Sequence, residues 1–190
     1  MGSVMHAVRE IAHEMSQMDR ALYAAVASTP TPYLDDGLRN LSRAANKSVL
    51  WIAIAGGMAV IGGPRDRRAA ATGQASIGVA SLLVNAGFKS VARRKRPDRQ
   101  AESIDRHVPM PESTSFPSGH SASAFAFAQG VSSVSPAMSV PLHMAALAVA
   151  YSRVHTGVHY PGDVVAGSLI GIVTGGAVSR ILARRLPPPG

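Results

Sequence analysis

The 190-residue sequence contains no cysteine, which excludes disulfide bonds and metal sites built from thiolates. It is also poor in charge. Asp, Glu, Lys and Arg make up 16% of the residues, whereas an average soluble domain has roughly 25%. The charged residues are unevenly distributed, because four long stretches contain none of them. These stretches are residues 48–64, 70–88, 119–152 and 164–179.

Uncharged stretches of this kind predict helices that cross a membrane. The hydrocarbon core of a bilayer is about 30 Å thick, so a spanning helix needs roughly 20 mostly apolar residues. Several of the stretches are short and rich in Gly and Ala, and a buried helix of a soluble protein could have a similar composition. However, 46% of the residues are hydrophobic, and little polar sequence remains to cover so many apolar segments. We therefore expect an all-α, integral membrane bundle of five to six transmembrane helices.

Apolar residues near the N-terminus recur at spacings of three and four, which predicts an amphipathic helix on the membrane surface or packed on the bundle. They are Val8, Ile11, Met15, Met18 and Leu22. The charged residues between them are unlike a cleavable signal peptide. Pro30 and Pro32 should end this helix, and a short second helix should follow over residues 35–46. We expect residues 1–46 to form these N-terminal helices and residues 47–186 to form the membrane-embedded core.

The order of the expected spans brings distant parts of the chain to one membrane face. The spans are predicted at residues 48–63, 70–92, 119–134, 140–152 and 163–182, and the longest polar loop at residues 93–118. If consecutive spans alternate in direction, the second span ends where the third begins. The fourth span ends, and the fifth begins, on that same side. The polar residues at these four helix ends should therefore lie close together.

The net charge of +8 is carried mainly by residues at the ends of the apolar stretches. That placement favours anionic lipid headgroups or a phosphorylated substrate over nucleic acid. The side away from the four gathered helix ends carries Arg65, Arg67, Arg68, Arg180, Arg184 and Arg185. The positive-inside rule makes that side cytoplasmic, so the gathered residues should face outward from a plasma or inner membrane. The equally basic residues 93–99 weaken this orientation.

Three stretches at the gathered helix ends carry groups suited to a phosphate. Lys89, Arg96 and Arg153 supply positive charge, and arginine can bind phosphate oxygens through two N–H groups. Ser118 and Gly119 open a helix, whose first N–H groups can approach an anion. The sequence therefore predicts a phosphate-binding site.

A nucleophile and an acid are available beside these cations. His159 is the candidate nucleophile, because Asp163 lies four residues later and could hold one ring nitrogen while the other attacks phosphorus. His120 is the candidate general acid for the departing alcohol. It could then act as the base for the water that hydrolyses a phosphohistidine.

Other interpretations of the same residues remain open. His155, His159 and Asp163 are spaced as three metal ligands on one helix face, but Gly157 and Pro161 interrupt that helix. No His-Glu-x-x-His pattern is present either, so we expect no metal and no other cofactor. Ser118 is a weaker nucleophile candidate, because nothing resembling Gly-x-Ser-x-Gly surrounds it. His155 could support the site by hydrogen bonding or only line its loop.

The three stretches resemble the signature of the type 2 phosphatidic acid phosphatase family, whose site is similar to that of the vanadium haloperoxidases. The family pattern is Lys-x6-Arg-Pro, Pro-Ser-Gly-His and Ser-Arg-x5-His-x3-Asp. Here it reads Lys89 to Pro97, Pro117 to His120, and Ser152 to Asp163, and no position departs from it. With the intervening spans, the resemblance covers residues 70–182 and extends to actinobacterial members of the family.

The resemblance implies a metal-independent phosphatase on a helical core, with the roles given above for each site residue. It implies a lipid phosphate as substrate, such as a polyprenyl phosphate or diphosphate, phosphatidic acid, phosphatidylglycerol phosphate or a polyprenyl-linked phosphosugar. A soluble acid phosphatase or a vanadate-dependent haloperoxidase with the same site is the alternative. A non-catalytic membrane or nucleic-acid-binding protein is a third possibility. Glycine-rich spans would also be compatible with a homodimer.

Overall fold

The computed structural model describes residues 2–88, 94–99 and 106–185, and in these ranges it contains seven α-helices and no strand. The helices are α1 (Gly2–Ser28), α2 (Pro32–Ala44), α3 (Val49–Ile61), α4 (Pro64–Leu82), α6 (Gly119–Ser132), α7 (Ser139–His155) and α8 (Pro161–Arg185). The short elements are the 3₁₀ turns η1 (Asn46–Ser48) and η3 (Pro136–Met138) and the π-helical segment η2 (Leu83–Phe88). The predicted all-α class is confirmed.

Helix α4 begins earlier than the sequence predicts. The sequence predicts a span from residue 70, but the basic segment after Gly63 already forms the first turns of α4. Pro64 occupies a position at the start of a helix where its missing N–H costs nothing, and Asp66 accepts a hydrogen bond from the Gly63 N–H at 3.3 Å. Pro64 and Asp66 therefore start the helix before its arginines, although the charge of that segment is unlike a membrane span. The α-helical part ends at Leu82, and the chain continues as η2.

The expected number of membrane spans is not confirmed. In the described residues, α8 is the one helix that is long and apolar enough to cross a bilayer by itself. Helix α2 and the η1–α3 segment meet at a bend of 66°, and they make a second span only if this bent pair is counted as one helix. Helices α3 and α6 have 13 and 14 residues. At roughly 1.5 Å per residue they are about 20 Å long, which is shorter than the hydrocarbon core.

Helix α6 is the central helix of the bundle and packs against α4, α7 and α8. Its Phe127 is fully buried and lies against Trp51 of α3, with ring centroids 5.3 Å apart. Helices α6 and α8 approach closely because α8 presents glycine. A Cβ atom on Gly175 would lie 2.7 Å from the carbonyl oxygen of Ala126. The close backbone contact fixes the relative position of these two helices.

The outer surface of the bundle carries many large apolar side chains. Examples are Val49, Ile52, Val60, Val79, Val140, Leu147, Val165, Leu169 and Val173, each more than 40% exposed. Polar and charged side chains, among them Arg153, His159 and Asp163, are buried instead. Such extensive apolar exposure is unusual for a soluble monomer and is typical of a surface that meets lipid or a partner.

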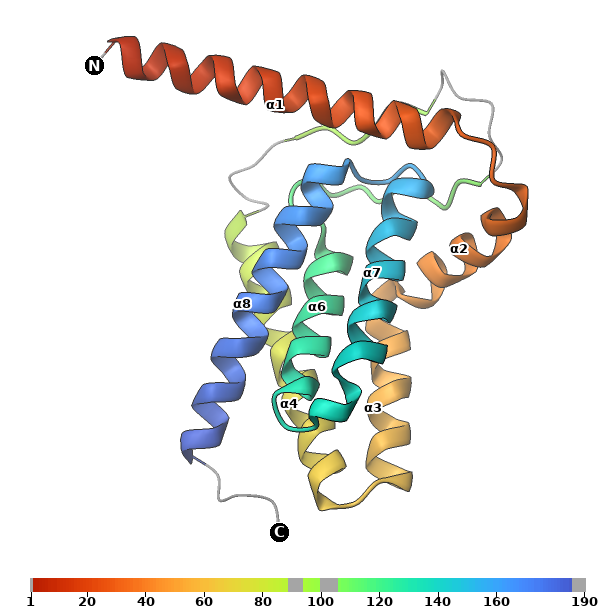
Figure 1. Cartoon of the computed structure of the whole chain (residues 1–190), viewed down its shortest axis with the longest axis vertical. Coiled ribbons are helices and arrows are strands. Elements are labelled where there is room, and N and C mark those ends of the chain that lie inside the picture. Colours follow the sequence, from red (N-terminus) through yellow and green to blue (C-terminus); the bar gives the residue numbers. More distant parts are fainter. Residues whose placement is uncertain (1, 89–93, 100–105, 186–190) are drawn as a thin grey trace.

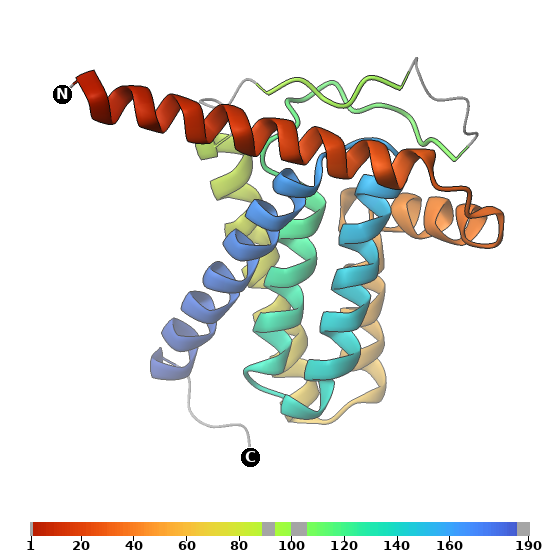
Figure 2. The same cartoon turned by 45° about the horizontal axis from the view of Figure 1, so that its top comes forward.

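Helix α1 lies across one end of the bundle, over the α7–α8 loop and the extended segment that precedes α6 (Figures 1 and 2). The predicted helix is present, but its apolar stripe does not face the bundle: Ile11, Met15 and Leu22 are exposed. Helix α1 contacts the bundle through a different face. On that face the ring of Tyr23 packs edge-on against the ring of Tyr160, with ring centroids 5.6 Å apart. The covered end of the bundle holds most of the residues that the sequence selects.

Candidate active site

The beginnings of α6 and α8 are joined at the covered end of the bundle. The backbone N–H of Ser118, the N-cap of α6, donates to the carbonyl oxygen of Asp163 at 2.9 Å. The preceding helix, α7, ends near His155, and Gly157 then takes a left-handed conformation with φ +69°. This turn lets the N–H groups of Val158 and His159 both donate to the carbonyl oxygen of Arg153. The signature residues around Ser118, Arg153 and His159 thus converge as predicted.

His159 and Asp163 form the buried centre of the site. The Nδ1 atom of His159 lies 3.5 Å from Oδ2 of Asp163, and both side chains are at most 2% exposed. The contact does not meet hydrogen-bond geometry, and Nδ1 has no other partner among the described residues. Such pairs are often loose when no substrate is bound and tighten in the reacting complex.

The other ring nitrogen of His159 faces Arg96. Nη1 of Arg96 lies 3.2 Å from Nε2 of His159 and donates to the carbonyl oxygen of Val158 at 2.7 Å. Because a guanidinium can only donate, Nε2 must be the acceptor, which assigns the ring proton to Nδ1, on the side of Asp163. Nε2 therefore carries the unprotonated electron pair, which accepts the hydrogen bond from Arg96.

The imidazole of His159 is neutral at physiological pH. Burial, together with the charges of Arg96 and Arg153, lowers the pKa of His159 to about 4, although Asp163 acts in the opposite direction. A neutral ring with its proton on Nδ1 is the form that can attack an electrophile through Nε2.

Asp163 is held by three donors besides its contact with His159. Its carboxylate accepts hydrogen bonds from the Ser115 hydroxyl, from the Tyr160 N–H at 2.9 Å and from Nη1 of Arg94 at 2.9 Å. These bonds fix the direction of the carboxylate and keep it ionised in a buried position.

Three arginines near His159 have no ion-pair partner in the part of the chain that the structure describes. Arg153 is 1% exposed; it donates to Ser42, and its Nε has no partner within that part. Arg99 donates to the Gly157 carbonyl oxygen at 2.8 Å, and its Nη2 likewise has no partner there. Burial lowers the pKa of both Arg96 and Arg99. Such uncompensated cations form an anion-binding environment.

The remaining predicted residues lie at the start of α6 or outside the described residues. Ser118 is buried, and its hydroxyl oxygen accepts from the Ser121 hydroxyl at 2.9 Å. Gly119 is the first residue of the helix. His120 is half-buried, and its Nε2 lies 2.9 Å from Oδ1 of Asn46 in η1. Lys89 lies outside the described residues.

His155 does not share a site with His159. Its Nε2 lies 3.1 Å from Oδ1 of Asp35 and 2.9 Å from the hydroxyl of Thr31, so it ties α7 to the N-terminal helices. The metal-site arrangement considered from the sequence is therefore not formed. Within the described ranges, no group of three or more His, Asp or Glu side chains is placed to hold a metal ion.

Sequence reasoning missed Arg94, Ser115 and Asn46. Arg94 stands in a run of basic residues that looks like a headgroup anchor, yet it binds Asp163. Ser115 lies two residues before the Pro117–His120 stretch but outside the family pattern, and Asn46 has no distinguishing neighbour in the sequence. The available signals were the position of Arg94 inside the Lys-x6-Arg-Pro segment and that of Ser115 beside the Pro-Ser-Gly-His segment.

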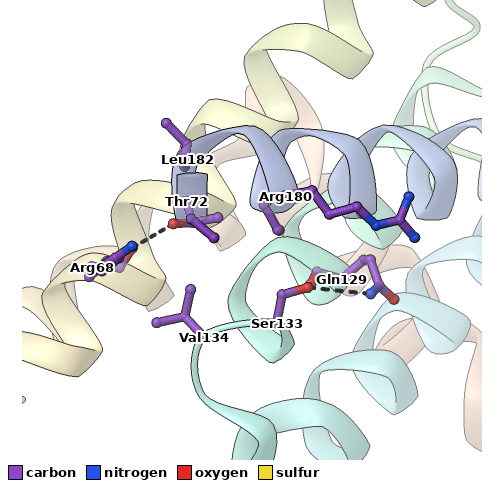
Figure 3. Close-up of a pocket in the computed structure, with 10 residues that line it drawn as sticks. Arg68, Thr72, Gln129, Ser133, Val134, Arg180 and Leu182 are labelled. Atoms are coloured by element: carbon purple, nitrogen blue, oxygen red, sulfur yellow. Dashed lines mark hydrogen bonds between the residues drawn. The ribbon is translucent and has the colours of Figure 1, made fainter. Parts of the chain in front are cut away.

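A cavity of about 250 Å³ lies at the other ends of α4, α6 and α8, and so apart from His159 (Figure 3). Its lining includes Arg68, Thr72, Gln129, Ser133 and Arg180. Arg68 stands in the first turns of α4, Ser133 follows α6, and Arg180 is near the end of α8. The cavity contributes nothing to the His159 site.

Comparison with known proteins gives a consistent family match. The model of the PAP2 superfamily matches residues 72–187. Decaprenylphosphoryl-5-phosphoribose phosphatase of Mycolicibacterium smegmatis is 34% identical over 154 residues, which are 77% of this chain and 77% of that protein. The protein of the same name from Mycobacterium tuberculosis H37Rv is 33% identical over 146 residues, 75% of this chain and 77% of that one.

Solved structures give the same fold. The transmembrane PAP2 type phosphatidylglycerolphosphate phosphatase from Bacillus subtilis superposes with a TM-score of 0.72 at 23% identity, covering 92% of this chain and 88% of that chain. LpxE from Aquifex aeolicus superposes with a TM-score of 0.69 at 25% identity, covering 84% of this chain and 93% of that chain. The fold extends beyond the residues matched by the family model, since these superpositions cover most of the chain.

Proposed function

Because this chain belongs to the PAP2 superfamily, a family of phosphatases that act on phosphomonoesters, we propose that it removes phosphate from a polyprenyl-linked phosphosugar through a phosphohistidine. One observation carries the proposal. His159 is buried and neutral, its Nε2 faces the Arg96 guanidinium, and its Nδ1 faces Asp163. A phosphate that takes over the N–H donor of Arg96 would release the electron pair of Nε2 and bring its phosphorus next to it.

In the first step, Nε2 of His159 attacks phosphorus and the bond from phosphorus to the alcohol oxygen breaks. His120 gives a proton to the departing oxygen, and Asp163 stabilises the positive charge that develops on the ring of His159. The charge of the equatorial phosphate oxygens is balanced by Lys89, Arg96 and Arg153 and by the N–H groups that follow Ser118 and Gly119.

In the second step, a water molecule attacks the phosphorus of the phosphohistidine. His120, now without its proton, takes one from the water. The phosphorus–nitrogen bond breaks, the electron pair returns to Nε2, and inorganic phosphate is released. Neither step requires a metal ion or another cofactor.

The substrate class rests on the relatives. The two mycobacterial proteins, at 33% and 34% identity, are named for decaprenylphosphoryl-5-phosphoribose, a phosphomonoester carried on a polyprenyl lipid. A polyprenyl phosphosugar also fits a site at the end of an apolar bundle, because its lipid can lie along the bundle while its phosphosugar enters the cationic end. The exposed apolar side chains and the long apolar helix α8 support a membrane location. The basic residues at the other end of the bundle, among them Arg68, Arg180 and Arg184, support a plasma-membrane orientation with the site facing outward.

The proposal is tested with detergent-purified protein and a panel of lipid phosphates. We expect release of phosphate from decaprenylphosphoryl-5-phosphoribose to exceed release from phosphatidic acid, phosphatidylglycerol phosphate and a polyprenyl diphosphate. Rapid quenching in alkaline detergent, in which a phosphorus–nitrogen bond is stable, with a ³²P-labelled substrate should trap label on the wild-type chain and none on His159→Ala. Equal release from every lipid would contradict the substrate class, and label on His159→Ala would contradict the nucleophile. Recovery of the protein without detergent would favour the soluble alternative.

A further inference from the structure

The N-terminal helix contacts the active site through one buried carboxylate. Asp19 of α1 has a side chain that is 10% exposed, and its Oδ2 lies 2.6 Å from Nη2 of Arg94. The same guanidinium uses Nη1 to bind Asp163 at 2.9 Å. Arg94 therefore stands between two carboxylates, one from α1 and one from the catalytic pair.

Asp19 also holds the backbone next to the catalytic pair. Its Oδ1 accepts a hydrogen bond from the N–H of Gly162 at 2.6 Å. A Cβ atom on Gly162 would lie 2.9 Å from Oδ2 of Asp19, so the contact depends on glycine at this position. Gly162 lies directly before Asp163, and the orientation of the Asp163 side chain depends on this backbone.

An aromatic contact supports the same arrangement. The guanidinium of Arg94 lies over the ring of Tyr160 at 4.2 Å, and Tyr160 packs against Tyr23 of α1. The N–H of Tyr160 is itself a donor to Asp163. Three residues that contact or precede Asp163, namely Arg94, Tyr160 and Gly162, are thus each held by α1.

We propose that α1 completes the active site and that Asp19 is a positioning residue, which acts through Arg94 and Gly162 on the Asp163–His159 pair. The inference rests on the proposed function and extends it to a helix outside the family match, which begins at residue 72. Sharing Arg94 between two carboxylates leaves Asp163 with part of its negative charge uncompensated. That charge keeps the proton of His159 on Nδ1 and stabilises the positively charged ring formed during attack.

The sharpest variant is Asp19→Asn. The amide oxygen can still accept from the Gly162 N–H, but the charge that shares Arg94 is gone. We expect kcat to fall by up to about 100-fold, the size expected when a reacting group is displaced by about 1 Å. KM should change little, because Asp19 contacts none of the proposed phosphate ligands. Glu14→Gln is the matched control: it removes an exposed carboxylate from the same helix and should leave kcat unchanged.

Arg94→Lys provides a second, independent variant. It keeps the positive charge, but a single ammonium cannot reach both carboxylates in the observed two-pronged geometry. It should reproduce the loss of kcat. Asp19→Glu keeps the charge and should recover part of the activity that Asp19→Asn loses. Melting temperatures and elution volumes in detergent identify any variant that has lost its fold.

A second measurement does not depend on turnover. The ¹⁵N spectrum of histidine-labelled protein reports which ring nitrogen carries the proton, and subtraction of the His159→Ala spectrum assigns His159. We expect the Nδ1–H form in the wild type and a mixture of both forms in Asp19→Asn. Wild-type kcat together with an unchanged His159 spectrum in a folded Asp19→Asn protein would overturn the inference. A wild type that hydrolyses no lipid phosphate would refute the proposed function instead, and the spectrum would then decide the role of Asp19.

Discussion

The Nε2 atom of His120 lies 2.9 Å from the side-chain oxygen of Asn46. Asn46 stands at the junction of α2 and α3, where Lys47 and Ser48 adopt left-handed conformations with φ of 51° and 60°. Left-handed backbone is costly for residues with a Cβ and is often found where a functional group must be held. The junction therefore presents Asn46 to the residue that we assign as the general acid.

Loss of this contact should affect difficult leaving groups most. Without the contact from Asn46 to Nε2, the ring of His120 would be less well oriented for proton donation. We expect Asn46→Leu to slow release of phosphate from a lipid alkyl phosphate by roughly 10-fold, a part of the 10²–10⁴-fold that general acids contribute. Hydrolysis of 4-nitrophenyl phosphate should slow less, because its leaving group needs no proton. Equal slowing of both substrates in steady-state assays would contradict this role.

Substitution of either member of the buried His159–Asp163 pair should greatly slow or abolish the reaction. His159→Ala takes away the nucleophile, so phosphate release should fall to background. Asp163→Asn removes the charge that favours the Nδ1–H form, and we expect a loss of at least about 100-fold. His143→Gln changes a histidine near the opposite end of α7 and serves as the control. Measurable turnover by a folded His159→Ala protein would exclude the phosphohistidine route.

The pH dependence of kcat/KM should follow the lowered pKa of His159. Because that pKa is about 4, the ring should stay neutral down to about pH 5, and the acid limb should lie near pH 4 and not near 6.5. An acid limb at pH 6–7 that arises from titration of the enzyme, and not of the substrate phosphate, would contradict the burial of His159.

The same pKa has a consequence for stability. The unfolded chain binds a proton on this residue below about pH 6.5, whereas the folded chain binds it only near pH 4. Stability should therefore fall as the pH decreases from about 6.5 to 4 and show no further contribution from His159 below that. Melting temperatures of the wild type should drop more over this range than those of His159→Gln.

The contact between α6 and α8 should tolerate no side chain at Gly175. A Cβ atom there would lie 2.7 Å from the Ala126 carbonyl oxygen and 2.9 Å from Cβ of Gln129, so Gly175→Ala should destabilise the fold by about 1–3 kcal/mol. The neighbouring Gly176 has nothing within 4 Å of its Cβ position. Gly176→Ala should be neutral or stabilising by up to about 1 kcal/mol. The melting temperatures of the two variants are compared in the same detergent. Equal melting temperatures would contradict the close approach of α8 to α6.

Phosphate release should persist in excess EDTA. His155 and His159 face different partners, and the phosphate charge is balanced by arginines. Loss of activity that returns on addition of a divalent cation would show that a metal takes part.

The sequence was most informative where function restricts residue type and spacing. The order of apolar stretches and signature residues predicted that Ser118, Arg153 and His159 meet at one end of the bundle. It was less informative about contacts that depend on the whole fold. Asp19, Arg94 and Asn46 are ordinary polar residues in sequence, and only their partners distinguish them. The apolar stripe of α1 was visible, but its spacing cannot tell that α1 packs through Asp19 and Tyr23 instead.

The element boundaries failed for a different physical reason. Hydropathy predicts that α4 begins at residue 70, after the arginines at 65, 67 and 68. In the structure, Pro64 and the carboxylate of Asp66 start the helix before these arginines. The number of spans expected from composition is not confirmed in the described residues, because composition counts apolar residues and takes no account of where a helix bends, as between α2 and α3.

Arg96, Arg99 and Arg153 are buried or half-buried, and none of them has a counter-ion among the described residues, so they repel one another. Any small oxyanion that binds between them should relieve this repulsion and raise the melting temperature, as ligands of the folded state do. Orthophosphate, the leaving product, is such an ion. The charge that draws the ester in should therefore also delay the exit of the product, and in phosphate-rich medium turnover should be limited by release.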